Sequence, residues 1–221
     1  MNIRLPEQFI YTYRGPNNCA YVQNGILYIE GSLHYEDLMY NLAYKLHGYN
    51  TCYYCGKSLF QNNRTLDHIY PRSWGGVSLP DNLCPACKNC NNRKTDMTLY
   101  QFKRYLDLHS SEEKQQFYLD CVKKNKKIIE KQDFILPSDW VTLYDASTLI
   151  NLIPFKYLDP TKLKKLENYY NYYKHFPHPI VVSSNGWLFK GKHILYHARK
   201  INNPIIPAIV LENVIVIKNT S

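Results

Sequence analysis

Residues 52–55 read C-Y-Y-C, residues 84–90 read C-P-A-C-K-N-C, and T-L-D-H-I-Y-P-R-S-W-G-G lies between them at residues 65–76. Five of the seven cysteines fall within these 39 residues. Two C-x-x-C knuckles can supply four thiolates to one tetrahedral zinc ion, which leaves no position for a substrate. The pattern therefore predicts a structural Zn²⁺ that takes the place of an ordinary hydrophobic core in residues 52–94.

The spacing alone leaves the choice of ligands in the second knuckle open. C-P-A-C-K-N-C contains two overlapping C-x-x-C pairs, 84/87 and 87/90, and Pro85 stiffens the first of them. Unmetallated buried thiols are the alternative to any zinc site. The two remaining cysteines, Cys19 and Cys121, stand alone, and we expect them to be small buried hydrophobic residues.

Asp67 and His68 stand side by side between the two knuckles, and the chain breakers Pro71, Gly75 and Gly76 follow them. Taken alone, such a pair is more often a capped turn with a solvated histidine. Adjacent side chains on a regular strand point to opposite faces, so these two can serve one site only where the strand ends and twists. A carboxylate suits a hard cation such as Mg²⁺, and an imidazole that titrates near neutral pH suits a general base.

The order of residues from 52 to 94 is Cys-x-x-Cys, Asp-His, Gly-Gly, Asn-Leu, Cys-x-x-Cys-Asn and Arg-Lys. This order resembles the HNH endonuclease family, of the kind whose ββα-metal fold is braced by a four-cysteine zinc. The resemblance spans about residues 50–96, roughly a fifth of the chain. It implies cleavage of DNA phosphodiester bonds by one-metal hydrolysis.

The resemblance also implies roles for individual residues. Asp67 and Asn91 would hold a catalytic Mg²⁺ or Mn²⁺, His68 would be the general base, and Asn82 would orient the loop that carries His68. Asn91 takes a place where histidine also occurs in the family. The implied ligands of the structural zinc are Cys52, Cys55, Cys87 and Cys90.

The charge of the chain agrees with a polyanionic partner. Lys and Arg number 27 against 18 Asp and Glu, a formal net charge of +9, although charge alone does not separate DNA, RNA and a membrane surface. We expect Arg72, Arg93 and Lys94 to contact phosphates, with a solvated surface cation as the alternative at each position. The K-K-N-K-K run at residues 123–127 is either a solvated helix face or a phosphate-contacting strip.

Outside residues 52–94 the sequence predicts ordinary helices and strands. Asn24-Gly25 predicts a type I′ turn in a hairpin over residues 19–31, and Leu38, Leu42 and Leu46 predict a helix that Gly48 ends. The other expected features are a helix over residues 99–106, a capping box of Ser110 and Glu113, short helices from Asp139 or Ser147, a helix from Pro160, a hairpin around Asn185-Gly186, and strands over residues 205–211 and 214–217.

The segment over residues 186–211 faintly resembles the ParB and sulfiredoxin-like fold, in which a Gly-x-x-Arg turn leads into a helix. Gly191 fits this pattern, but Ile194 stands in place of the arginine and His197 in place of a small residue. We therefore expect a degenerate module that positions DNA or contacts a protein partner. A plain structural α+β domain is the alternative.

Together these patterns predict an α+β chain with four segments: an N-terminal hairpin and helix (residues 1–48), an HNH nuclease domain (49–108), a connecting helix (109–133) and a C-terminal α+β module (134–221). The expected function is a divalent-metal-dependent HNH endonuclease acting on double-stranded DNA. The alternatives are a non-catalytic zinc-dependent nucleic-acid-binding protein and a ParB-like regulatory protein.

The sequence has no apolar run of the length that a membrane span needs and no signal peptide at its start, so we expect a cytoplasmic protein without a membrane partner. A phage or mobile-element role fits the family, and a homodimer or a protein partner bound through residues 134–221 stays open.

Overall fold

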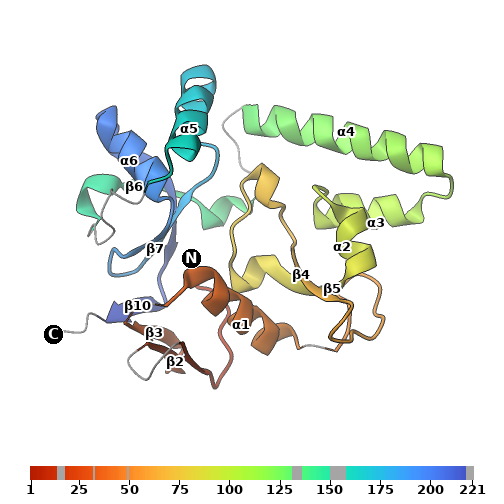
Figure 1. Ribbon diagram of the computed structural model, residues 1–221, viewed down its shortest axis with the longest axis horizontal. Helices are drawn as coiled ribbons and strands as arrows, with labels where there is room; N and C mark the ends of the chain where they lie inside the picture. Colours follow the sequence, from red (N-terminus) through yellow and green to blue (C-terminus); the bar gives the residue numbers. More distant parts are fainter. Residues whose placement is uncertain (14–17, 32, 49, 131–135, 150–157, 218–221) are drawn as a thin grey trace. The chain divides into compact units, whose positions relative to one another are not determined.

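The computed structural model describes residues 1–13, 18–31, 33–48, 50–130, 136–149 and 158–217 (Figure 1). The chain forms two compact units: unit 1 is Met1–Leu38 with Pro137–Ser221, and unit 2 is Met39–Leu136. Helices alternate with small sheets in the order of the chain, which confirms the α+β class. The finer division into four segments stays a prediction. None of the described helices is long and apolar enough to cross a membrane.

The first sheet of unit 1 joins strands from both ends of the chain. Its order is β1 (Ile10–Thr12), β2 (Cys19–Gln23), β3 (Ile26–Glu30) and β10 (Val214–Ile217). Asn24 and Gly25 have φ angles of 52° and 73°, as the predicted type I′ turn between β2 and β3 requires. β10 runs parallel to β3, a pairing that the sequence did not indicate. Cys19 is only partly buried, contrary to prediction, because its thiol donates to the Glu30 carboxylate.

The second sheet of unit 1 has the order β6 (Thr142–Asp145), β9 (Ile205–Leu211), β7 (Ile180–Ser183) and β8 (Leu188–Lys190). Helices α5 (Pro160–Tyr173) and α6 (Lys192–Lys200) contribute to the core of this region, and Pro160 opens α5 as predicted. The short 3₁₀ helices η3 (Ser138–Trp140) and η4 (Ala146–Thr148) lie where short helices were expected. Ile194 is buried in this core, so it has a packing role at the position where the ParB-like pattern has arginine.

Unit 2 contains a ββα arrangement. β4 (Arg64–His68) pairs antiparallel with β5 (Leu83–Cys87), and α2 (Lys88–Lys94) follows β5 directly and packs on both strands. The loop between the strands carries the 3₁₀ helices η1 (Arg72–Trp74) and η2 (Pro80–Asn82). This arrangement brings residues from β4 and from α2 to one place.

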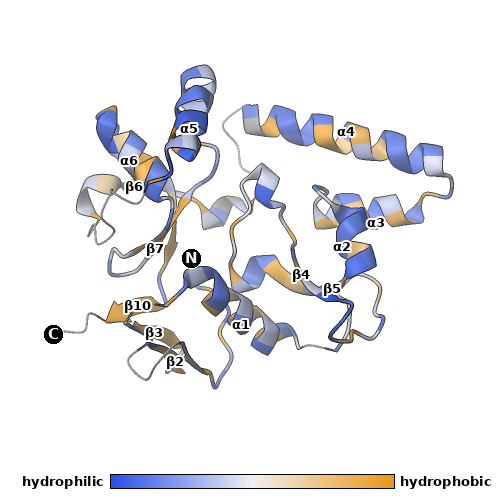
Figure 2. Ribbon diagram, viewed as in Figure 1, coloured by the Kyte–Doolittle hydropathy of each residue, from blue (hydrophilic) through white to orange (hydrophobic). Residues whose placement is uncertain are grey.

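Three further helices belong wholly or partly to unit 2. α1 (Tyr35–His47) ends before Gly48, whose φ of 74° fits the predicted left-handed cap. α3 (Leu99–Asp107) and α4 (Ser111–Glu130) follow α2, and α4 alternates apolar and polar residues along its length (Figure 2). The predicted capping box is present, since Ser110 accepts from the Glu113 N–H and Glu113 accepts from the Ser110 N–H.

The core of unit 2 surrounds the cysteine knuckles. Its buried members are Cys52, Leu59, Ala86, Cys90, Met97, Phe102 and Cys121. Cys121 is therefore buried as predicted. Two of the seven residues come from the knuckles, so the packing of this small core depends on how the cysteines are held.

Candidate active site

The four cysteines that the family resemblance selected lie together in unit 2. The sulfur atoms of Cys52, Cys55, Cys87 and Cys90 are all within 4.8 Å of one another. A tetrahedral site with Zn–S bonds of about 2.3 Å separates its sulfurs by about 3.8 Å, and the Sγ atoms of Cys55 and Cys87 are 4.0 Å apart. The donor set and the spacing therefore fit a structural zinc ion.

The backbone around the knuckles favours a thiolate at Cys52, whereas burial raises the pKa of the Cys55 and Cys90 thiols. The Gly56 N–H donates to the Cys52 carbonyl with Gly56 at a φ of 68°, which closes the first turn. Cys87 is the N-cap of α2, and its sulfur accepts the Cys90 N–H at 3.4 Å. Burial raises the pKa of the Cys52 thiol, but hydrogen bonds from backbone groups, first that of Cys87, outweigh it and bring the pKa down to about 7.

Cys84 lies outside this cluster. It is fully buried on β5 opposite Asp67, and its thiol donates to the Tyr54 hydroxyl at 3.4 Å. Burial, and then the negative charge of Asp67, raise the pKa of Cys84 to about 12. Cys84 is therefore a buried thiol, which resolves the overlap between the two C-x-x-C pairs.

The Asp67 carboxylate is held by two donors on one of its oxygens. Oδ2 accepts the Tyr54 hydroxyl at 2.5 Å and pairs with the Lys94 ammonium at 2.9 Å. Burial, with the nearby Cys84 and Asp67 charges, raises the pKa of Tyr54, so this phenol stays a donor. Within the described part of the chain, Oδ1 accepts no hydrogen bond. Asp67 is 7% exposed, and one of its oxygens is left for a cation.

Lys94 corrects one expectation from the sequence. Its side chain is fully buried, and Nζ also donates to the His68 carbonyl at 2.7 Å, so it cannot contact a phosphate as predicted. A buried ammonium needs such partners because taking a charge out of water is costly. Lys94 instead fixes the Asp67 carboxylate and the backbone at His68 together.

Asn91 presents its amide in one orientation. Its Nδ2 donates to Thr65 Oγ1 at 3.0 Å and to the Leu66 carbonyl at 3.4 Å. Both acceptors are on β4, one and two residues before Asp67. Among the residues that the structure describes, none donates to Asn91 Oδ1. The β4–α2 contact therefore gives two amide or carboxylate oxygens without protein partners, one from each element.

His68 ends β4 and turns its imidazole to the following loop. Nε2 lies 3.0 Å from the hydroxyl of Ser78, which is fully buried. If Nε2–H is the donor in this contact, Nδ1 carries the lone pair of the neutral ring. Asp67 and His68 are thus the last two residues of β4, and the strand ends at the position that the sequence required if they serve one site.

Asn82 closes the loop between the two strands. It is fully buried, its Oδ1 accepts the Tyr70 N–H at 2.7 Å, and its Nδ2 donates to the carbonyls of Tyr70 and Val77 at 3.1 and 2.9 Å. Gly76 permits this closure, because a Cβ there would lie 1.9 Å from the Tyr70 carbonyl oxygen. Asn82 has the contacts that a loop-orienting residue needs, and each buried group that it satisfies would cost about 1–3 kcal/mol if left alone.

Sequence reasoning missed Tyr54 and gave Lys94 a different role. A weak signal was available for Lys94, since it is three residues after Asn91 and so on the same face of α2. No comparable signal pointed to Tyr54, whose role depends on how the first knuckle packs beside β4. Both residues act through Asp67, because the Tyr54 hydroxyl and the Lys94 ammonium each bind its Oδ2.

The comparison with protein families agrees with this geometry. Residues 52–107 match the family model of HNH endonucleases. The matched region includes both knuckles, the two strands, α2 and α3. A search of curated proteins found no match.

Proposed function

We propose that the HNH endonuclease domain carried by residues 52–107 hydrolyses phosphodiester bonds of DNA with the help of a divalent metal ion. The observation that carries this proposal is that Asn91 on α2 binds β4 just before Asp67, while Asp67 and Asn91 each keep one oxygen that no donor among the described residues occupies. His68 is the residue after Asp67 on the same strand. The formal net charge of +9 suits a polyanionic substrate.

The residues fit a hard cation better than a soft one. Asp67 Oδ1 and Asn91 Oδ1 would hold Mg²⁺ or Mn²⁺, which prefer oxygen ligands and complete their shell with water and substrate phosphate. When bound, such an ion neutralises the charge on the phosphate and stabilises the leaving oxygen. Tyr54 and Lys94 occupy the other oxygen of Asp67, so the carboxylate has one orientation before the ion arrives.

His68 would act as the general base. A water molecule would attack the phosphorus while the His68 imidazole takes one of its protons, so that the new P–O bond forms and the P–O3′ bond breaks. The 3′ oxygen takes a proton from solvent, and His68 later returns its own proton to solvent. Ser78, whose hydroxyl lies 3.0 Å from Nε2, would hold the orientation of the imidazole ring.

Zinc has a separate role in this proposal. Four cysteine ligands complete a tetrahedral shell, so the ion at the knuckles cannot bind substrate. It would brace the first knuckle, which carries Tyr54, against the start of α2. The structural ion and the catalytic ion are then different metals with different ligand types.

The nature of the product ends tests this proposal. With added Mg²⁺ or Mn²⁺, we expect the wild type to cut an end-labelled DNA duplex into fragments with 5′-phosphate and 3′-hydroxyl termini, which DNA ligase can rejoin. Fragments that ligase cannot rejoin would contradict hydrolysis of the P–O3′ bond. Absence of cleavage under both ions, with nucleic-acid binding retained, would favour the non-catalytic zinc-dependent binding protein.

A further inference from the structure

A cavity of about 440 Å³ lies between α2, α3 and α4 of unit 2. Its lining contains two cations, Arg93 and Lys114, together with hydroxyl and amide groups such as those of Ser111, Gln115 and Tyr118. Among the described residues, no aspartate or glutamate lines it. The cavity is therefore basic and rich in hydrogen-bond donors.

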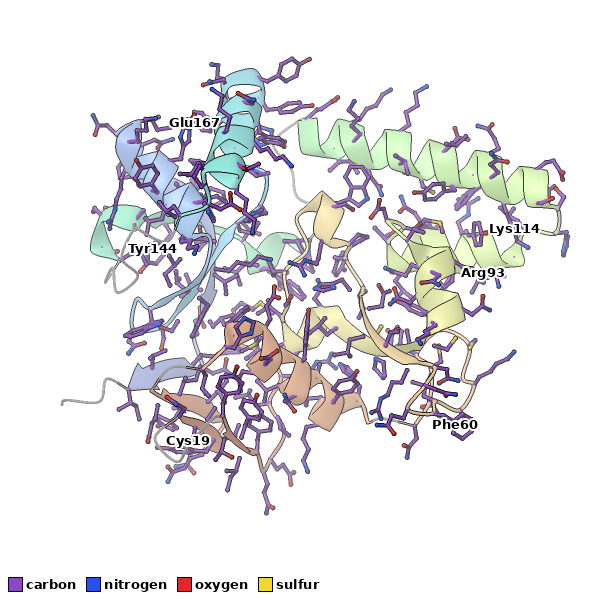
Figure 3. All side chains as sticks on the ribbon, viewed as in Figure 1. Cys19, Phe60, Arg93, Lys114, Tyr144 and Glu167 are labelled. Atoms are coloured by element: carbon purple, nitrogen blue, oxygen red, sulfur yellow. The ribbon has the colours of Figure 1, made fainter. Side chains whose placement is uncertain are left out.

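The two cations converge on one aromatic ring. The Arg93 guanidinium carbon lies 5.7 Å, and the Lys114 ammonium 6.0 Å, from the ring centroid of Tyr105. Within the part of the chain that the structure describes, neither side chain forms an ion pair or a hydrogen bond. Figure 3 labels both residues, which come from the neighbouring helices α2 and α4. Two like charges at one ring, in a cavity whose described lining contains no carboxylate, favour an anion that would offset their repulsion.

We propose that this cavity binds a backbone phosphate of the nucleic acid, a proposal that rests on the nuclease function above and adds a second anchoring point for its substrate. A guanidinium and an ammonium can both donate to phosphate oxygens, the former through two parallel hydrogen bonds. The donors on α4 suit the remaining oxygens of the same group.

The phosphate bound here is not the one that is cut. Arg93 follows Asn91 by two residues, which is about 200° around a helix of 3.6 residues per turn. Asn91 faces β4, whereas Arg93 faces Tyr105 on α3. A nucleic acid that contacts both faces of α2 must present different phosphates to them. The contact at Arg93 and Lys114 therefore positions the nucleic-acid strand, and phosphodiester cleavage takes place at the face of α2 that carries Asn91.

The contribution of α4 comes from outside the region that matches the family model. Ser111, Lys114, Gln115 and Tyr118 lie beyond the region that matches the family, which ends at residue 107. The basic run at residues 123–127 is on the same helix, but Lys126 is twelve residues from Lys114, about 18 Å along the axis. The described lining of the cavity does not include this run.

The experiment compares two double variants that each remove two positive charges. Arg93→Gln with Lys114→Gln removes the cavity cations, and Lys45→Gln with Lys103→Gln removes two exposed cations, one on α1 and one on α3. Affinity for a fluorescent DNA duplex is measured by anisotropy at several salt concentrations without added divalent ion. We expect the cavity variant to bind about ten-fold more weakly and to lower the slope of log Kd against log salt by about one, whereas the control keeps the wild-type slope.

Equal changes of affinity and slope in the two double variants would overturn the proposal, and so would a cavity variant that binds like the wild type. Zinc content and thermal unfolding of both variants are compared with the wild type, so that a misfolded protein is recognised. The binding assay does not depend on cleavage. If the wild type does not cleave DNA, the nuclease function is contradicted, but the binding result for the cavity is still valid. If the cavity variant cleaves at the wild-type rate and its salt slope is unchanged, only the phosphate site in the cavity is contradicted.

Discussion

A Cys87→Ser variant is expected to lose its zinc and to unfold under conditions in which the wild type is folded. Cys87 belongs to the four-sulfur cluster and is also the N-cap of α2, where its sulfur accepts the Cys90 N–H. Structural zinc sites contribute about 10–16 kcal/mol of apparent binding free energy near neutral pH, and that energy is coupled to folding. Metal analysis and thermal unfolding followed by circular dichroism measure the two losses.

Cys84→Ser is the matched control, since it makes the same chemical change three residues earlier on β5. The Cys84 thiol only donates to the Tyr54 hydroxyl, and a serine hydroxyl can make the same contact. We expect this variant to keep about one zinc per chain and to remain folded. Loss of zinc in Cys84→Ser together with retention in Cys87→Ser would show that the other overlapping pair binds the metal.

A His68→Ala variant is expected to cleave DNA about 10²–10⁴-fold more slowly than the wild type, because a positioned general base contributes a factor of this size. The oxygens that would hold the divalent ion belong to other residues, so the dependence of the remaining rate on Mg²⁺ concentration should not change. Single-turnover cleavage of a DNA duplex with added Mg²⁺ measures both quantities.

His109→Ala is the control for this substitution. His109 is exposed just before α4, and its backbone N–H, which alanine retains, donates to Glu113. This variant should cleave at the wild-type rate, and both variants should keep the wild-type zinc content. A His68→Ala variant that cleaves as fast as His109→Ala would remove His68 from the mechanism.

The parts of the fold that could be predicted from the sequence are those that local chemistry determines. Asn24-Gly25 can take the positive φ angles of a hairpin turn, and Ser110 with Glu113 satisfies two helix N–H groups within four residues. The cysteine cluster is also of this kind. Each C-x-x-C knuckle is a short local turn, and the need of zinc for four ligands predicts that the two turns lie together.

The parts that could not be predicted depend on contacts between distant segments. The pairing of β10 with β3 joins the two ends of the chain, and the residues of these strands do not indicate that they pair with each other. Lys94 looked like a surface cation beside Arg93, yet the packing of α2 on β4 buries it against Asp67. The side chains of two adjacent basic residues therefore have opposite environments, one in the site and one at the cavity.

The sequence likewise left Cys84 ambiguous for a reason that the register of the sheet explains. Cys84 pairs with Asp67 across β4 and β5, and Cys87 pairs with Arg64 at the other end of the same strands. A shift of three residues along β5 thus separates the buried thiol beside the carboxylate from the sulfur that caps α2. Spacing along the chain does not contain this information.

The most direct test of a nuclease with separate structural and catalytic metals is the conversion of supercoiled plasmid to nicked circles. The wild type is dialysed against buffer without divalent ions, its zinc content is determined, and the plasmid is added with and without Mg²⁺ or Mn²⁺. We predict about one zinc per chain in every sample and nicking only where Mg²⁺ or Mn²⁺ is added. Absence of nicking with either ion, or equal nicking by the zinc-loaded protein alone, would contradict the account.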